Sequence, residues 1–408
     1  MPDADPRALA LRVLDHVGRG KFAAPTLDHA LSRHDLTPQQ AGLVTDLVYG
    51  TLRRERWLEA ALTTLLRDPE GLPQELRWLL RAGTYEKLFT QRPAHVLVNA
   101  WVGVAKRRFG KLSGLVNAVL RRVELPSAPE PVRLGLPDFL YSHWRDYYGD
   151  VSWAAALNEP APLWLTVFPG GREALRSEGI DFEAGPLPDS VSVRGTSLRE
   201  LAAYRQGLVQ PQNPSSLLAA MLLDAPAGAR VLDLAGGAGI KAAWLAANGA
   251  RVTSYDLRSS RQRAGRRNLE RLGLEVEFKT HDLRRPLADS APYVFLDAPC
   301  LGTGTLRGHP ELRRRLREDD LKESAALQAL LLENAARSVA PAGVLVYAVC
   351  SLTKPEGEGL VASFLERHPE FIADNPTIPL PRLRRGTGVY VKPVDGLDGF
   401  YYARLRRG

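Results

Sequence analysis

The stretch that decides the fold runs from residue 293 to residue 304, with the sequence YVFLDAPCLGTG. Its first four residues are apolar and predict a buried strand, which stops at the carboxylate of Asp297. Pro299 and two glycines then predict a turn. Ligands of a parallel α/β sheet bind at the carboxyl ends of its strands, so we expect Asp297 and Cys300 in a ligand crevice. The alternative is a capping aspartate followed by an inert core cysteine.

A second strand pattern, GVLVYA at 343–348, leads into the other cysteine, Cys350. The chain contains only two cysteines, and both follow the end of a predicted buried strand. No further Cys or His lies at ligand spacing, so we expect no metal site. A disulfide is the remaining alternative, although the chain resembles a cytosolic one. Two thiols and a carboxylate at adjacent strand ends suggest nucleophilic catalysis.

From Gln210 onward, strand and helix patterns alternate, which predicts a Rossmann-like, doubly wound parallel sheet of the α/β class. Residues 230–234 and 251–256 form its first two strands, and 276–280 form the third. The glycine-rich turn at 235–239 follows the first strand and opens a helix.

The glycine-rich turn is compatible with two cofactors. Gly237, Gly239 and Ala242 match the spacing of a dinucleotide fingerprint, with Asp256 as the ribose-binding acid. Asp233 argues against this hypothesis, because it places an anion where a pyrophosphate would bind.

The acids that follow three successive strands suit a cofactor that carries positive charge. S-adenosyl-L-methionine has a sulfonium and an α-ammonium group, which the carboxylate of Asp233 would face. Asp256 would accept hydrogen bonds from the ribose, and Asp282 would lie near the adenine. The alternative is that these three acids only cap helices.

Residues 1 to about 125 predict an all-helical region, because apolar residues recur at helical spacing. Thr37 followed by Pro38 predicts a helix start with a threonine N-cap. Basic residues form three clusters here, which favours an RNA-facing surface, although a single cluster is usually only a solvated face. The clusters are Arg53, Arg54 and Arg56; Lys106, Arg107, Arg108 and Lys111; and Arg121 and Arg122.

The proline-rich stretch 125–131 has no periodicity and is expected to be a linker. We therefore divide the chain into an all-helical domain (1–128), a linker helix with a small α/β subdomain (129–206) and the Rossmann-like domain (207–408).

The composition favours a polyanionic partner. The net charge is +8, with 54 basic and 46 acidic residues, and most of the basic residues are arginines, which suit phosphate. A codon bias toward arginine is the alternative. We expect no membrane span, because no sufficiently long apolar run occurs. The acidic start at residues 1–6 is unlike a secretory signal, so we expect a cytoplasmic protein.

Two known families share motifs with this chain. Residues 297–304, with His-Pro-Glu at 309–311 and YAVCS at 347–351, closely resemble motifs of the NOL1/NOP2/Sun family of RNA cytosine-C5 methyltransferases. SGLVNAVLRR at 113–122, supported by DLVYGTLR at 46–53, resembles the NusB family of helical RNA-binding domains. Together the resemblances imply S-adenosyl-L-methionine-dependent methylation of cytosine C5 in RNA, with bacterial 16S rRNA as the expected substrate.

The resemblance also implies a role for individual residues. Cys350 would add to cytosine C6 and turn the ring into an enamine-like nucleophile, for which the base must leave its stack. Asp297 would bind the N3/N4 edge and supply a proton, Cys300 would assist release of the enzyme, and Lys241 would contact the cofactor or order the site. The expected cofactor-binding residues are Asp233, Ala235, Gly237, Gly239, Lys241, Asp256, Arg261, Asp282 and Asp297.

The chain departs from the family pattern in three places. The usual Cys-Ala-Ala-Pro-Gly-Gly-Lys turn is AGGAGIK at 235–241, the Glu-Asn-Glu after the second cysteine is EGE at 356–358, and an expected lysine is Arg313. Three alternatives therefore stay open: a tRNA cytosine-C5 methyltransferase, a non-catalytic rRNA-binding assembly factor with a degenerate cofactor loop, and a nicotinamide-dependent oxidoreductase.

Overall fold

The computed structural model describes residues 5–198, 200–374 and 376–408, so the first four residues of the acidic start lie outside it. The chain divides into two compact units, which we call the helical unit and the sheet unit. The helical unit comprises Met1–Ser142, Leu157–Glu159 and Leu306–Leu316; the sheet unit comprises His143–Ala156, Pro160–Thr305 and Arg317–Gly408.

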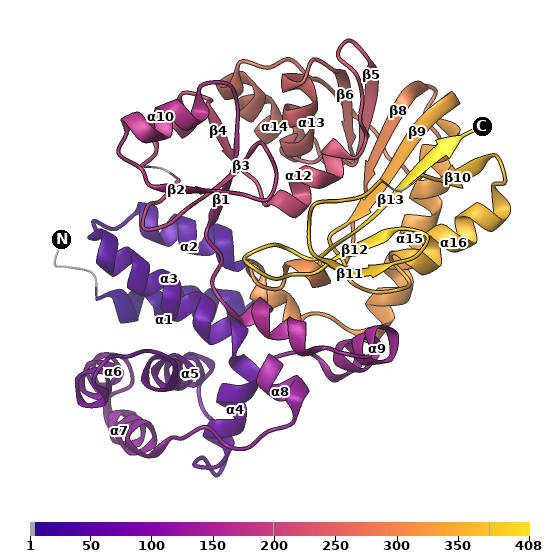
Figure 1. Cartoon of the computed structure of the whole chain (residues 1–408). Coiled ribbons are helices and arrows are strands. Elements are labelled where there is room, and N and C mark those ends of the chain that lie inside the picture. The colour runs from indigo at the N-terminus through magenta and orange to yellow at the C-terminus, as the bar shows by residue number, and fades with distance from the viewer. Residues whose placement is uncertain (1–4, 199, 375) are drawn as a thin grey trace. The chain divides into compact units, whose positions relative to one another are not determined.

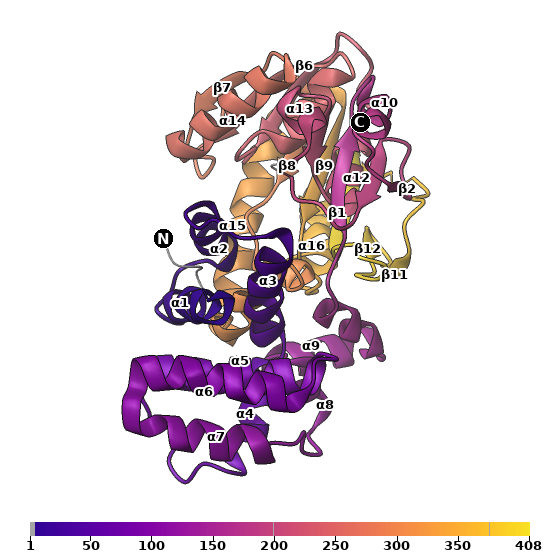
Figure 2. The same cartoon turned by 90° about the vertical axis from the view of Figure 1, so that its left-hand side faces the viewer.

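The N-terminal part of the helical unit is all-helical, as predicted, and α6 packs against α5 and α7 (Figure 2). Trp78 and Trp101 are fully buried in its core. Thr37 forms a capping box with Gln40, which confirms the predicted start of α3. The helices are α1 (Pro6–Gly18), α2 (Ala23–Ser32), α3 (Pro38–Arg53), α4 (Glu55–Thr63), α5 (Gln74–Phe89), α6 (Ala94–Phe109) and α7 (Ser113–Arg122).

Two short helices follow, and one of them corrects the predicted linker. Pro131 was expected in the linker but lies in the first turn of α8 (Glu130–Leu134), where proline is tolerated because its missing N–H would have no helical partner. The predicted aromatic helix is present as α9 (Asp138–Tyr148).

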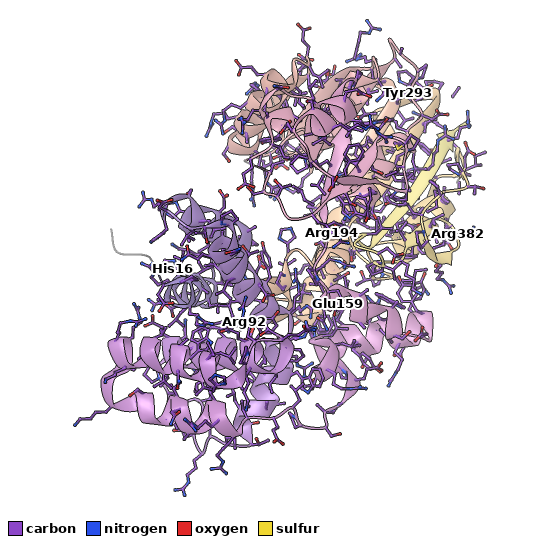
Figure 3. The ribbon with its side chains drawn as sticks, turned by 60° about the vertical axis from the view of Figure 1, so that its left-hand side comes forward. His16, Arg92, Glu159, Arg194, Tyr293 and Arg382 are labelled. Atoms are coloured by element: carbon purple, nitrogen blue, oxygen red, sulfur yellow. The ribbon has the colours of Figure 1, made fainter. Side chains whose placement is uncertain are left out.

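The sheet unit contains the predicted parallel strands, in the order β9-β8-β5-β6-β7. Figure 1 shows β9, β8, β5 and β6 side by side. Tyr293 lies on β8 (Figure 3). The sheet is mixed rather than purely parallel, because the C-terminal strand β13 pairs antiparallel with β9. The parallel strands are β5 (Arg230–Leu234), β6 (Arg251–Asp256), β7 (Glu277–Thr280), β8 (Ala291–Asp297) and β9 (Val339–Val349).

Antiparallel strands complete this sheet and form a second one. In the large sheet, β12 lies between β11 and β13, and β10 also pairs with β13. The small sheet has the order β2-β3-β1-β4 and includes the predicted strand at 162–168. The strands are β1 (Leu163–Val167), β2 (Phe182–Ala184), β3 (Ser190–Val193), β4 (Val209–Pro211), β10 (Phe371–Ala373), β11 (Arg382–Arg385), β12 (Val389–Val391) and β13 (Phe400–Arg407).

Helices cover both faces of the large sheet. Val346 and Ala348 of β9 share a core cluster with residues of α12 and α13. Between them, Tyr347 points to the opposite face, where its hydroxyl donates a hydrogen bond to Gln328 of α15. These helices are α12 (Pro214–Met221), α13 (Ile240–Ala247) and α15 (Glu318–Arg337); α14 (Ser259–Leu272) and α16 (Glu358–Arg367) complete the unit.

Among the described residues, we find no helix that combines the length and the apolarity needed to cross a membrane.

Candidate active site

The two cysteines lie together at the carboxyl end of the parallel strands. β8 and β9 are neighbours, with Asp297 opposite Ala348, so both strands end at the same edge. The Sγ atoms of Cys300 and Cys350 are 3.2 Å apart, and both thiols are free. The expectation that the thiols meet at adjacent strand ends is therefore confirmed, while their catalytic roles stay predictions.

Close backbone packing holds the loop after Cys300. The N–H of Gly304 donates a hydrogen bond to the carbonyl oxygen of Cys350 at 3.0 Å, and the N–H of Gly399 donates one to Gly304 at 2.9 Å. A Cβ atom at position 304 would collide with the Gly399 backbone. Glycine is thus required in this motif because two backbones approach here.

Lys241 and Asp297 form an ion pair beside the thiols. Lys241 Nζ donates a hydrogen bond to Asp297 Oδ2 at 2.7 Å. Burial alone would lower the pKa of Lys241, but the charges of Asp297, Cys350 and Asp233 outweigh it and raise that pKa. The lysine is therefore a fixed cation between the glycine-rich turn and Cys350.

The two thiols differ in their surroundings. The pKa of Cys300 is raised well above its usual value, first by the hydrogen bond with Cys350, then by burial and by the negative charges of Cys350 and Glu356. Cys300 is therefore held as a neutral thiol, able to donate its S–H to Cys350. The arrangement favours one nucleophile and one proton donor rather than two equivalent thiolates.

A cavity of about 340 Å³ adjoins this site. It brings together four residues that the sequence assigns to the cofactor: Ala235, Asp256, Arg261 and Asp282. Pro299 also lines it, so the cavity reaches the Cys300 loop. The guanidinium of Arg284 lowers the pKa of Asp282 to about 2, which keeps this carboxylate charged.

The residues present fit a cationic cofactor. Asp233 is fully buried; its Oδ2 accepts a hydrogen bond from Ser254 at 2.7 Å, whereas Oδ1 has no partner among the described residues. Burial is the main cause that raises the pKa of Asp233 to about 6. A buried acceptor without a donor suits the α-ammonium of S-adenosyl-L-methionine.

The same turn argues against the dinucleotide hypothesis. The N–H of Gly237, which a pyrophosphate would need, donates instead to Asp256 Oδ2 at 3.0 Å. Gly239 has a positive φ of 69° and caps α13, and its Cα faces Leu269 and Phe278. Gly239 is thus placed for turn geometry and packing.

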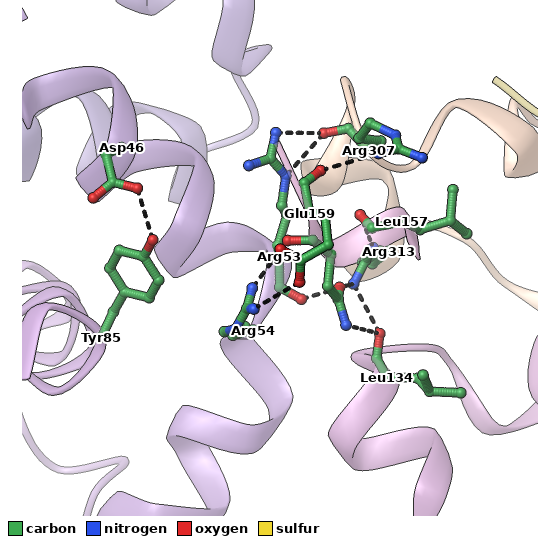
Figure 4. A network of polar contacts seen from close by, with 10 residues as sticks. Asp46, Arg53, Arg54, Tyr85, Leu134, Leu157, Glu159, Arg307 and Arg313 are labelled. Carbon is green, nitrogen blue, oxygen red and sulfur yellow. Dashed lines mark hydrogen bonds and ion pairs between the residues drawn. The ribbon is translucent and has the colours of Figure 1, made fainter. Parts of the chain in front are cut away.

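Two residues of one predicted basic cluster, Arg53 and Arg54, make contacts within the helical unit rather than forming a purely solvated face. Arg53 donates hydrogen bonds to the carbonyl oxygen of Arg307, and Arg54 donates one to that of Asn158 (Figure 4). Burial lowers the pKa of Arg53 to about 10. These side chains therefore bind the unit together internally. The exposed basic residues of α6, α7 and the turn between them are Lys106, Arg107, Arg108, Lys111, Arg121 and Arg122.

Comparison with known proteins identifies the family to which the chain belongs. Residues 220–406 match the family described as 16S rRNA methyltransferase RsmB/F, and residues 4–125 match the NusB family. Ribosomal RNA small subunit methyltransferase B of Thermus thermophilus is 54% identical over 402 residues, which cover 98% of each chain. The chain belongs to the RsmB family of ribosomal RNA methyltransferases. A second RsmB, from Erwinia tasmaniensis, is 31% identical and covers 90% of each chain.

Solved structures share the fold. The crystal structure of PH0851 superimposes with a TM-score of 0.82 at 24% identity and covers 98% of this RsmB-family chain and 99% of its own. NSun6 from Pyrococcus horikoshii gives a TM-score of 0.60 at 20% identity and covers 67% of this chain and 98% of its own. The predicted Rossmann-like fold with a NusB-like helical region is confirmed, and the cofactor of this methyltransferase is S-adenosyl-L-methionine.

Sequence reasoning missed one residue of the site. Glu356 was noted only as part of a departure from the family pattern, yet its carboxylate lies between the segments that follow the two cysteines. The only signal in the sequence was its position shortly after Cys350. Nothing in a strand or turn pattern shows that a following acid folds back into the core.

Proposed function

We propose that this protein methylates C5 of a cytosine in 16S rRNA through a covalent adduct between Cys350 and C6 of the base. The observation that carries the proposal is the meeting of two thiols, 3.2 Å apart, beside the Lys241–Asp297 ion pair. A thiolate, a neutral thiol, a carboxylate and an ammonium group are the set of groups that this reaction requires.

The first step is nucleophilic attack on the base. The thiolate of Cys350 adds to C6, and electron density moves through the ring toward C5. Asp297 binds the N3/N4 edge and relays a proton from the Lys241 ammonium to N3 through the 2.7 Å hydrogen bond between them. The carboxylate is again ionised after the relay, and Lys241 is left neutral. The bound cofactor supplies an electrophilic methyl group to the activated C5.

The second step releases the enzyme. Water takes the C5 proton, the electrons of the C5–H bond form the C5–C6 double bond, and the Cys350 sulfur leaves as a thiolate. N3 returns its proton through Asp297 to Lys241. Cys300, held neutral by its raised pKa, donates its S–H to the departing thiolate. The separate environments of the two thiols thus match an attacking and a releasing role.

RNA binding is assigned to the exposed basic surface of the helical unit. Lys106 lies in the last turn of α6, and Lys111 lies in the short turn that follows it. Arg121 and Arg122 lie in the last turn of α7. Their charges suit phosphate contacts, which position an RNA without reading its sequence.

The altered turn at 235–241 supports a second candidate, an rRNA-binding assembly factor without catalysis. Ala235 has a positive φ of 60°, which is strained for a residue with a side chain. A turn that departs from the family pattern and holds a strained residue is expected where the selection for cofactor binding has been lost.

Methyl transfer from labelled S-adenosyl-L-methionine to unmodified 16S rRNA and to unmodified tRNA tests both candidates, with Cys350→Ala run in parallel. The proposal requires label in cytosine of 16S rRNA that disappears in the variant. Label in tRNA alone would favour the tRNA enzyme, and no label with no cofactor binding would favour the assembly factor.

A further inference from the structure

The carboxylate of Glu356 is fully buried and connects the segments that follow the two cysteines. Leu301, the residue after the first cysteine, donates its backbone N–H to Oε1 at 2.9 Å. Ser351, the residue after the second cysteine, donates its hydroxyl to Oε2, and Thr353 donates another at 2.9 Å. Oε1 therefore binds the segment after Cys300, and Oε2 binds the segment after Cys350.

A third segment, helix α15, meets the same carboxylate. Ser324 and Gln328 donate hydrogen bonds to Oε1 of Glu356 at 2.7 and 3.0 Å. Gln328 also donates to the carbonyl oxygen of Pro299 at 2.9 Å, directly before the first cysteine. The hydroxyl of Tyr347 donates to the backbone carbonyl of Glu356 at 2.7 Å. The strand, both loops and the helix therefore converge on one residue.

The donors that the structure describes around this carboxylate are all neutral: a backbone N–H, three hydroxyls and an amide. A buried carboxyl group is costly unless its oxygens are hydrogen-bonded, and here five donors satisfy the two oxygens. The donors come from segments that are far apart in the sequence. Their hydrogen bonds therefore set the relative positions of these segments, which no local turn could do.

We propose that Glu356 is a positioning residue for both thiols, because its carboxylate holds the Cys300 loop and the Cys350 loop at a fixed separation. The inference rests on the proposed function only where methyl transfer is measured; the separation of the thiols is a property of the protein alone.

The charge of this carboxylate has a second effect. It is one of the causes that raise the pKa of Cys300, after the hydrogen bond with Cys350 and burial. Glu356 thereby helps to keep Cys300 as the neutral partner of the pair.

Two substitutions separate these effects. In Glu356→Gln the amide oxygen can still accept from Leu301, while the amide N–H group faces the hydroxyls of Ser351 and Thr353, which can act as acceptors. This variant keeps the connection and removes the charge. Glu356→Ala removes both and leaves the N–H of Leu301 without its acceptor.

The separation is tested with phenylarsine oxide, whose arsenic bonds to two thiols with loss of one water molecule and so requires neighbouring sulfurs. We expect wild type and Glu356→Gln to bind it with equal affinity, and Glu356→Ala to bind at least about tenfold more weakly. Cys300→Ser is the negative control, and Glu86→Gln, at another fully buried glutamate in the helical unit, is the matched control. Unchanged affinity in a folded Glu356→Ala would overturn the proposal.

The charge is tested by alkylation of Cys300 with iodoacetamide across a range of pH, followed by mass spectrometry of its peptide. In Glu356→Gln we expect faster alkylation by about threefold or more below the pKa of the thiol, because loss of the nearby negative charge lowers that pKa and raises the thiolate fraction. Single-turnover methyl transfer should slow in Glu356→Ala with RNA affinity unchanged, and Glu356→Gln should restore part of the rate. If no variant transfers methyl groups, the proposed function fails while the two thiol measurements still decide the role of Glu356. An alkylation profile identical to wild type in Glu356→Gln would overturn the electrostatic part.

Discussion

Lys241 Nζ lies 2.7 Å from Asp297 Oδ2, so the first turn of α13 is tied to the end of β8 by an ion pair. The side chains are only 13% and 29% exposed, and solvent therefore screens the pair weakly. This contact connects the cofactor side of the site with the thiol side.

Replacing Lys241 by Met should lower the methyl-transfer rate by about a hundredfold or more, because Asp297 loses the group that orients it and supplies the proton that it relays to N3. The dissociation constant of S-adenosyl-L-methionine should change far less, since Asp233 and Asp256 remain. Rapid-quench kinetics and calorimetric titration separate the two quantities. A large loss of cofactor affinity with an unchanged rate would assign Lys241 to cofactor binding instead.

Cofactor affinity should depend on pH through Asp233. Its folded-state pKa of about 6 is raised, so the carboxyl is mostly neutral at about pH 5 and ionised at about pH 7. A cationic cofactor prefers the ionised form, and affinity should rise by about tenfold over this interval. Titrations across this range check it, and Asp233→Asn should bind weakly at every pH. A flat profile in the wild type would contradict the assignment.

The same shift makes a prediction about stability. The pKa of Asp233 is about 6 in the folded state and about 4 in the unfolded state, so the folded state binds this proton more tightly. The free energy of unfolding should therefore decrease as pH rises from about 4 to about 6. The cofactor-free Asp233→Asn variant should lack that decline. Urea denaturation of both proteins at several pH values measures the difference, and parallel pH curves would refute the prediction.

Arg313 should be essential to the stability of the helical unit. Its buried guanidinium donates hydrogen bonds to the carbonyl oxygens of Arg53, Leu134 and Leu157 and to the side chain of Asn158 (Figure 4). Burial lowers its pKa to about 9. Arg313→Ala should lower the free energy of unfolding by about 3 kcal/mol or more, because several buried acceptors lose their donor.

The control for Arg313 is the exposed residue Arg122, where alanine should change stability by about 0.5 kcal/mol or less. Arg313→Lys should rescue only part of the loss, since an ammonium group lacks the planar fork that reaches these acceptors. Chemical denaturation followed by circular dichroism would show whether the two alanine variants differ; equal stabilities would contradict the role of Arg313.

RNA affinity should fall when the exposed basic surface of α6 and α7 is altered. Lys111→Ala and Arg122→Ala should each weaken RNA binding at low salt and reduce the slope of log affinity against log salt by about one unit or less. Arg176→Ala on α10 (Gly171–Ser177), another exposed arginine, serves as control. Filter binding at several salt concentrations measures the slopes. Equal effects in all three variants would show that this surface does not bind RNA.

The sequence predicted the parts of the fold that depend on local pattern. The strands at 230–234 and 251–256 have the predicted bounds. A glycine-rich turn ends the first strand, and the carboxylate of Asp256 marks the end of the second. The two cysteines were expected together because parallel strands end at one edge of a sheet. The assigned domain boundaries stay a prediction, although residues 306–316 pack within the helical unit.

Contacts between distant segments were not predictable from these patterns. Arg53 resembled a residue of a solvated helix face, but its partner is a carbonyl oxygen 254 residues further along the chain. Glu356 and Arg313 are similar cases, because charged residues are usually exposed and their burial depends on acceptors or donors that only the folded chain assembles.

The central claim is tested most directly with RNA in which the target cytosine carries fluorine at C5, because the fluorine blocks the proton loss that releases the enzyme. Wild type and Cys300→Ser should form a denaturation-resistant RNA–protein adduct, and peptide mapping should place the RNA on Cys350. Cys350→Ala should form none. An adduct on Cys300, or methyl transfer to cytosine without any adduct, would contradict the account.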